Sequence, residues 1–147
     1  MIPALTRGVL PPGVHPGDWK EVESMFGTTP WRLWLMEGLR AAARELARWG
    51  CEVVYLDGSF ITSKPIPGDY DLVWEHTNVD LAAVDPLFTQ PKYLAPPRDA
   101  QKKKYRGDLL PNVPEGSSGL LFVDYFQRDK NTGDPKGIVT LDPRLVP

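Results

Sequence analysis

The sequence predicts an α+β fold in which helices pack on a small mixed β-sheet. A long amphipathic helical pattern covers residues 30–49, and β-branched and aromatic runs occupy residues 51–56 and 70–75. Helix and strand patterns then alternate without an internal repeat. The chain has 147 residues, of which 41% are hydrophobic, and this length and composition suit one core. We therefore expect a single domain over residues 1–147.

The N-terminal segment predicts an extended arm followed by a short helix. Residues 1–17 contain Pro3, Pro11, Pro12 and Pro16, which favour extended backbone. Asp18 can cap a helix over residues 19–26, with Glu21 three residues later as its capping-box partner, and Gly27 ends that helix.

The strongest helical pattern covers residues 30–49. Pro30 suits a first helical turn, and Gly50 is a C-terminal stop. Apolar residues recur at helical spacing at Leu35, Leu39, Ala42, Ala43 and Leu46. This face should pack on the sheet.

The rest of the chain predicts three further strands and one basic helix. Strands are expected at 70–75, 120–127 and 138–141, a loop at 60–68, and a helix at 98–109. Residues 79–88 fit either a short helix or an edge segment, and the sequence leaves this choice open.

Composition excludes several classes of protein. The net charge of -2 gives no general attraction to nucleic acid or membranes. Cys51 is the only cysteine, so neither an intrachain disulfide nor a cysteine metal cluster can form. No segment has the pattern of a signal peptide or a membrane span, and we expect a cytoplasmic protein.

Three aspartates are candidate metal ligands. Asp69 and Asp71 stand two residues apart, so on a strand both carboxylates share one face. Asp124 lies in an otherwise apolar segment, where a carboxylate is costly unless it is paired or bound to metal. The alternatives are a surface turn for the pair and a solvent-facing strand end for Asp124. Magnesium prefers oxygen ligands of this kind.

Gly58 and Ser59 are candidate phosphate ligands. A glycine after a buried strand lets the backbone approach a phosphate, and the serine hydroxyl can donate to it. Such a pair is also common in ordinary turns. The order of strand, Gly-Ser, short loop and Asp-x-Asp is more specific than either part alone.

Basic residues could complete a phosphate site. The segment 102–106 carries three lysines and Arg106, and could grip a triphosphate or a nucleic-acid acceptor, with Tyr105 available for stacking. A solvated helix surface is the alternative, and the role of this segment stays open. Lys64, Lys130 and Lys136 are further candidates; for the last two, a soluble hairpin turn is the simpler explanation.

These motifs resemble those of the nucleotidyltransferase superfamily with a polymerase beta-like fold. The matching residues are Gly58-Ser59, Asp69-Tyr70-Asp71 and Asp124. The stretches "LPPGVHPGDWKEVESMFG" and "YLDGSFITSKPIPGDYDL" are similar to a branch of small bacterial proteins assigned to that superfamily.

The resemblance implies a palm-like sheet and a metal-dependent transfer of a nucleoside monophosphate. Asp69, Asp71 and Asp124 would hold Mg²⁺, with Mn²⁺ as the alternative, and Gly58 and Ser59 would hold the phosphates of an NTP, ATP above all. The acceptor would be a protein or a tRNA or other RNA, in a toxin–antitoxin or defence setting. The chain departs from the family in two ways: Lys64 is the only cation in the loop where small bacterial members often carry an arginine, and the helical domain of larger members is missing.

Two other functions fit the same residues. One is a catalytically inactive binding module that acts as a regulatory or antitoxin partner, or that needs a partner protein to complete its site. The other is an ordinary small α/β protein whose acidic cluster belongs to the fold.

Overall fold

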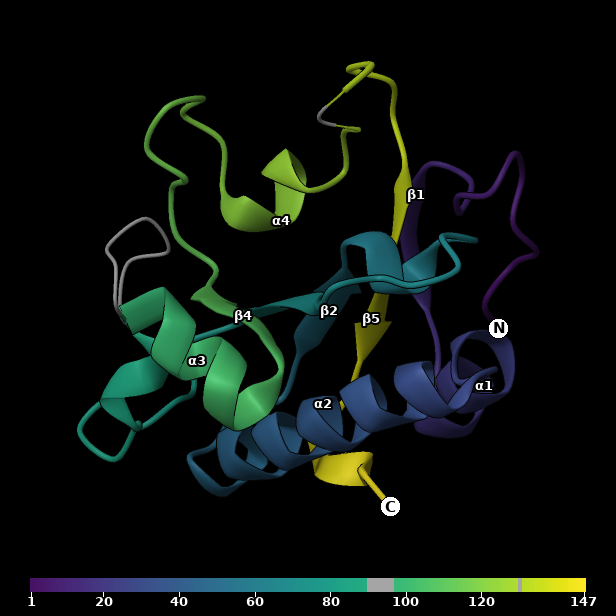
Figure 1. Cartoon of the computed structure of the whole chain (residues 1–147). Helices are drawn as coiled ribbons and strands as arrows, with labels where there is room; N and C mark the ends of the chain where they lie inside the picture. The colour runs from purple at the N-terminus through teal and green to yellow at the C-terminus, as the bar shows by residue number, and fades with distance from the viewer. Residues whose placement is uncertain (90–96, 130) are drawn as a thin grey trace.

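The computed structural model describes residues 1–89, 97–129 and 131–147, so the prediction for Lys130 lies outside the described residues (Figure 1). Within them, five strands form one mixed sheet in the order β1-β5-β2-β3-β4. β2 pairs antiparallel with both β3 and β5, whereas β1 pairs parallel with β5 and β4 parallel with β3. The predicted α+β class is confirmed. The strands are β1 Gly13–Pro16, β2 Val54–Asp57, β3 Tyr70–Trp74, β4 Gly107–Pro111 and β5 Gly137–Leu141.

The two N-terminal helices form where the sequence predicts them. α1 covers Trp19–Phe26 and begins with the expected capping box, in which the Glu21 amide donates to Asp18 and the Asp18 amide to Glu21. α2 covers Pro30–Arg48. None of the described helices is long and apolar enough to cross a membrane.

Helices cover both faces of the sheet. Leu56, Leu72 and Val139 belong to the main core, which α1 and α2 complete. Val73 and Leu110, on the opposite face, pack with Phe122 and Phe126 from the segment around α4 (Phe122–Tyr125). Figure 1 shows α2 and α4 on opposite sides of the sheet. The sheet is therefore the middle layer of the molecule.

The predicted basic helix ends earlier than expected and continues into a strand. α3 covers Pro97–Tyr105, and β4 begins two residues later. Arg106 takes a left-handed conformation with φ of 70°, which breaks the helix. Gly38 of α2 allows this turn, because a Cβ there would overlap the Tyr105 carbonyl oxygen.

The strand predicted at residues 120–127 is wrong. This segment contains α4 instead, and its two phenylalanines, Phe122 and Phe126, are one helical turn apart and both face the second core cluster. The Val123 amide donates to Asn112 Oδ1, 3.1 Å away, which fixes the start of the helix next to β4. An aromatic-rich segment can bury its side chains as a short helix as well as it can as a strand, when the face of a sheet is available for packing.

Other segments settle what the sequence left open. Residues 79–88 form neither a regular helix nor an edge strand; they contain turns and the 3₁₀ helix η2 (Pro86–Phe88). Residues 13–16 of the predicted arm form β1 at one edge of the sheet. Two further 3₁₀ helices, η1 (Ser59–Ile61) and η3 (Pro143–Leu145), follow β2 and β5.

Candidate functional site

Three aspartates lie side by side on one face of the sheet. Asp71 of β3 is paired in register with Asp57 of β2 and with Asp108 of β4. Residues directly opposite each other on paired strands project to the same face. This face also carries Val73, two residues beyond Asp71, and is the one that α4 covers. We call Asp57, Asp71 and Asp108 the aspartate row.

The aspartate row is largely enclosed. Only 1% of Asp57 and 2% of Asp108 is exposed, and Asp71 is half-buried. Carboxylates are rarely buried to this degree unless they are paired with other groups. Asp57 and Asp108 therefore need polar or charged partners inside the protein.

The Gly-Ser turn packs directly against the middle of the aspartate row. Gly58 has φ of 86°, and a Cβ placed on it would lie 2.5 Å from Asp71 Oδ2. Only glycine allows both this backbone conformation and this close approach. Ser59 follows at the start of η1 and is half-buried. The structure thus brings Gly58, Ser59 and Asp71 together.

Two lysines approach carboxylates at this site. Lys136 Nζ lies 3.6 Å from Asp57 Oδ1, and the lysine side chain is 18% exposed. Lys102 Nζ of α3 lies 2.8 Å from Asp69 Oδ2, one residue before β3. Both lysines place positive charge next to a carboxylate, which favours the ionised form of that carboxylate.

Arg32 organises the loop after the Gly-Ser turn. Its guanidinium is buried and donates to four carbonyl oxygens: from Nη1 to Phe26 and Phe60, and from Nη2 to Thr62 and Lys64, over 2.5 to 3.3 Å. Burial lowers the pKa of Arg32 below its usual value. The loop from η1 to Lys64 is therefore held by a side chain of α2.

Arg32 could have been found in the sequence. It precedes Leu35 and Leu39 by three and seven residues, so it lies on the apolar face of the predicted helix. A charged residue at such a position must find polar partners inside the protein.

The predicted third carboxylate occupies a different element. Asp124 is exposed and lies on α4, and the carboxylate next to Asp71 on the following strand, β4, is Asp108. Within the described parts of the chain, no group of three or more His, Cys, Asp or Glu side chains is arranged to hold a metal ion. Asp69, Asp71 and Asp124 therefore do not gather into such a group. Asp108 was not predicted because it lies within residues 98–109, which the sequence pattern favours as a helix, whereas the structure has β4 there.

The remaining predicted cations make structural contacts. Lys64 is exposed, and its carbonyl is one of the groups that Arg32 binds. Arg106 lies against α2, where Nη1 donates to the Trp34 carbonyl over 2.6 Å and pairs with Glu37 at 3.2 Å. These contacts direct Arg106 toward the helix layer.

The sequence model of one protein family covers these site residues. Residues 3–142 match the sequence model of a family described as a "Family of unknown function (DUF6932)". The chain belongs to this family. The match to DUF6932 spans the aspartate row, the Gly-Ser turn and Lys136. No match was found among the curated proteins or among the solved structures.

Proposed function

We propose that this protein is a metal-dependent nucleotidyltransferase, which moves a nucleoside monophosphate from an NTP to a hydroxyl group of a protein or RNA acceptor. The contact between Gly58 and Asp71 Oδ2, at the centre of the aspartate row, carries the proposal. It joins a phosphate-binding type of turn to a carboxylate cluster, which is the juxtaposition that phosphoryl-group chemistry needs. The polymerase beta-like resemblance of the same motifs supports this reading.

The turn would bind the phosphates. Gly58 brings the chain close to Asp71, the Ser59 hydroxyl can donate, and Lys136 supplies a cation one residue before β5. Arg32 keeps the loop beyond the turn in place by binding four of its neighbouring carbonyls. The triphosphate would thus meet a preformed surface.

Magnesium fits this site when a nucleotide is bound with it. The described residues contain no three-ligand group, but Mg²⁺ at phosphate sites commonly takes one or two carboxylates and completes its shell with phosphate oxygens and water. Asp71, with Asp69 or a neighbour in the aspartate row, would hold it. When bound, the ion would neutralise charge on the phosphates and on the attacking and leaving oxygens.

In the transfer step, the buried carboxylate of Asp108 on β4 would act as the base. The acceptor oxygen would form a bond to the α-phosphorus, and the bond from that phosphorus to the bridging β-phosphate oxygen would break, which releases pyrophosphate. Asp108, directly beside Asp71, would accept the proton of the acceptor hydroxyl. Mn²⁺ could replace Mg²⁺, and ATP is the NTP that we expect.

Labelling with each radioactive NTP, Mg²⁺ and cell extract tests the proposal. We expect a labelled protein or RNA, with labelling reduced about 100-fold or more in Asp71→Asn and Asp108→Asn. Asp124→Asn is the matched control, because Asp124 is exposed on α4. If Asp124→Asn lost as much labelling as Asp71→Asn, or if Asp71→Asn lost none, the assignment of the site would be wrong.

A second candidate is a catalytically inactive module that binds a nucleotide or a partner, for example as an antitoxin or regulator. The lysines on Asp57 and Asp69, and the lack of a three-ligand group in the described residues, favour it. It predicts nucleotide binding by calorimetry without any labelled product.

A further inference from the structure

Two tryptophans of α2 are exposed to an unusual extent. Trp31 is 40% exposed and Trp34 is 42% exposed, whereas Trp19, Trp49 and Trp74 are at most 8% exposed. The two exposed rings are stacked on each other, with centroids 4.9 Å apart and planes 20° apart. Large aromatic side chains bury most of their surface unless the exposed part binds something.

Arg106 extends this pair into a three-layer arrangement. Its guanidinium carbon lies 4.2 Å from the centroid of the Trp34 ring, within the range of a cation–π contact. Its position depends on a left-handed backbone with φ of 70°, which costs free energy in a residue other than glycine. We call Trp31, Trp34 and Arg106 the Trp stack.

The Trp stack is connected to the candidate site. The Trp31 indole nitrogen donates to the Pro67 carbonyl oxygen over 2.6 Å, and Pro67 is two residues before Asp69. Asp69 in turn binds Lys102 of α3. The stacked rings therefore lie beside the loop that leads into β3, on a rigid helix.

Two lysines of α3 precede Arg106. Lys102, which is 38% exposed and pairs with Asp69, and the exposed Lys103 lie four and three residues before Arg106. A flat aromatic surface next to cations complements a nucleobase and its phosphate, because stacking tolerates any base and the cations attract the backbone.

We infer that the Trp stack binds the unpaired end of a single-stranded nucleic acid. The base stacks on the exposed tryptophan surface and the lysines of α3 contact its phosphates, while Arg106 supports the Trp34 ring. The binding of a single strand does not depend on the proposed function. The further step, in which that strand is the acceptor of the transferred nucleotide, rests on the proposed function and makes the acceptor an RNA or other single strand in place of a protein.

Fluorescence anisotropy of a labelled unstructured RNA of about ten nucleotides tests this inference. We expect binding that weakens with salt, and about 10-fold weaker binding in Trp31→Ala and Trp34→Ala. Leu33→Ala is the matched control, because Leu33 is 39% exposed on the same helix. Circular dichroism checks that each variant is folded.

The outcomes separate this inference from the proposed function. The wild type should bind the RNA equally well without any NTP, whether or not the chain transfers nucleotides. Equal RNA binding by Trp31→Ala, Leu33→Ala and the wild type would overturn the inference, as would equally tight binding of a duplex of the same length. Labelling that depends on Asp71 but is confined to a protein would overturn the acceptor role while it supports the transferase.

Discussion

At the scale of single residues, the site depends on the close approach of one backbone to one carboxylate. Gly58 lies against Asp71, and the lysine nearest to this contact binds Asp57 on the neighbouring strand. Each of these residues can be changed without touching the main core.

Replacing Gly58 should destabilise the protein more than its backbone conformation alone explains. In Gly58→Ala the new Cβ meets Asp71 Oδ2 at 2.5 Å, in addition to the strain of φ 86°. Gly119 has a similar φ of 75° with nothing within 4 Å of a Cβ, so Gly119→Ala measures the strain alone. We expect losses of about 1 kcal/mol for Gly119→Ala and about 2–3 kcal/mol for Gly58→Ala by urea unfolding. Equal losses would show that the Asp71 contact has no energetic weight.

Replacing Lys136, the lysine at Asp57, should strengthen the binding of a metal cation and weaken the binding of ATP. In Lys136→Met the carboxylate loses a positive neighbour, so Mn²⁺ alone should bind about 5–10-fold more tightly and ATP more weakly, as calorimetry would measure. Lys136→Arg should restore wild-type behaviour, and the exposed Lys20→Met should change neither affinity. Unchanged Mn²⁺ affinity in Lys136→Met would rule out the lysine as a counter-ion of the site.

At the scale of elements, a side chain closes one edge of the sheet. Gln101 of α3 is 1% exposed; its amide nitrogen donates to the Leu109 carbonyl over 2.9 Å, and its oxygen accepts from the Leu109 amide over 3.2 Å. The amide also binds the Leu87 carbonyl. Gln101 thus mimics a neighbouring strand and holds β4, which carries Asp108, at the edge of the sheet.

Gln101→Ala should therefore loosen β4. Two buried backbone groups of Leu109 would lose their partner, and we expect a loss of about 2–3 kcal/mol in the free energy of unfolding together with faster hydrogen exchange of the Leu109 amide. Gln127→Ala is the control, since its amide makes a partly buried bond to Val123, and it should cost about 1 kcal/mol. Slow exchange of Leu109 in Gln101→Ala would contradict this role.

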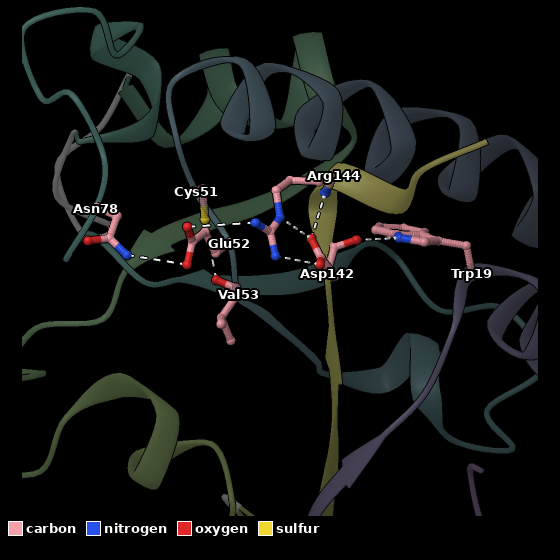
Figure 2. A network of polar contacts seen from close by, with 7 residues as sticks. All are labelled: Trp19, Cys51, Glu52, Val53, Asn78, Asp142 and Arg144. Carbon is pink, nitrogen blue, oxygen red and sulfur yellow. Dashed lines mark hydrogen bonds and ion pairs between the residues drawn. The ribbon is translucent and has the colours of Figure 1, made fainter.

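At the scale of the whole molecule, polar contacts join both ends of the chain. The Trp19 indole of α1 donates to the Asp142 carbonyl over 2.9 Å, and Arg144 binds the Asp142 carboxylate at 2.8 Å and Glu52 at 3.6 Å (Figure 2). Asn78 continues the network by donating to Glu52. The segment after β5 is thereby fastened to α1 and to the approach to β2.

This network predicts a loss of stability in acid. The hydrogen bond from Arg144 lowers the pKa of Asp142, so its folded-state pKa lies below its unfolded value of about 3.9. The stabilisation is present above that unfolded value and is lost as pH falls through the folded-state pKa. We expect Asp142→Asn to unfold more easily at pH 6 and to show a smaller further loss at pH 3, by urea titration. Asp134→Asn, on an exposed turn, should keep the wild-type pH dependence.

Some of the site was predictable because its signals are local. The capping box of α1 and the apolar face of α2 repeat within one turn of helix, and both helices form as predicted. The Gly58-Ser59 turn follows β2 and Asp71 lies on the paired strand β3, so a short connection suffices to bring them together.

The other half of the site depends on contacts between distant segments. The segment from Gly107 to Pro111 becomes a strand because β3 pairs with it and Gln101 covers its outer edge. Residues 122–125 become a helix because the exposed sheet face offers a place for two phenylalanines. Neither choice is encoded in local spacing, since strand preference depends on the neighbours that a segment finds.

The α+β class, the helices α1 and α2, and a Gly-Ser turn near an Asp-x-Asp thus follow from patterns along the chain. The neighbours of Asp71 follow from strand pairing instead: Asp57 and Asp108 rather than Asp124 flank it. The physical reason is that helices are specified by interactions along the chain, whereas the partners of a strand are chosen by packing and hydrogen bonds across it.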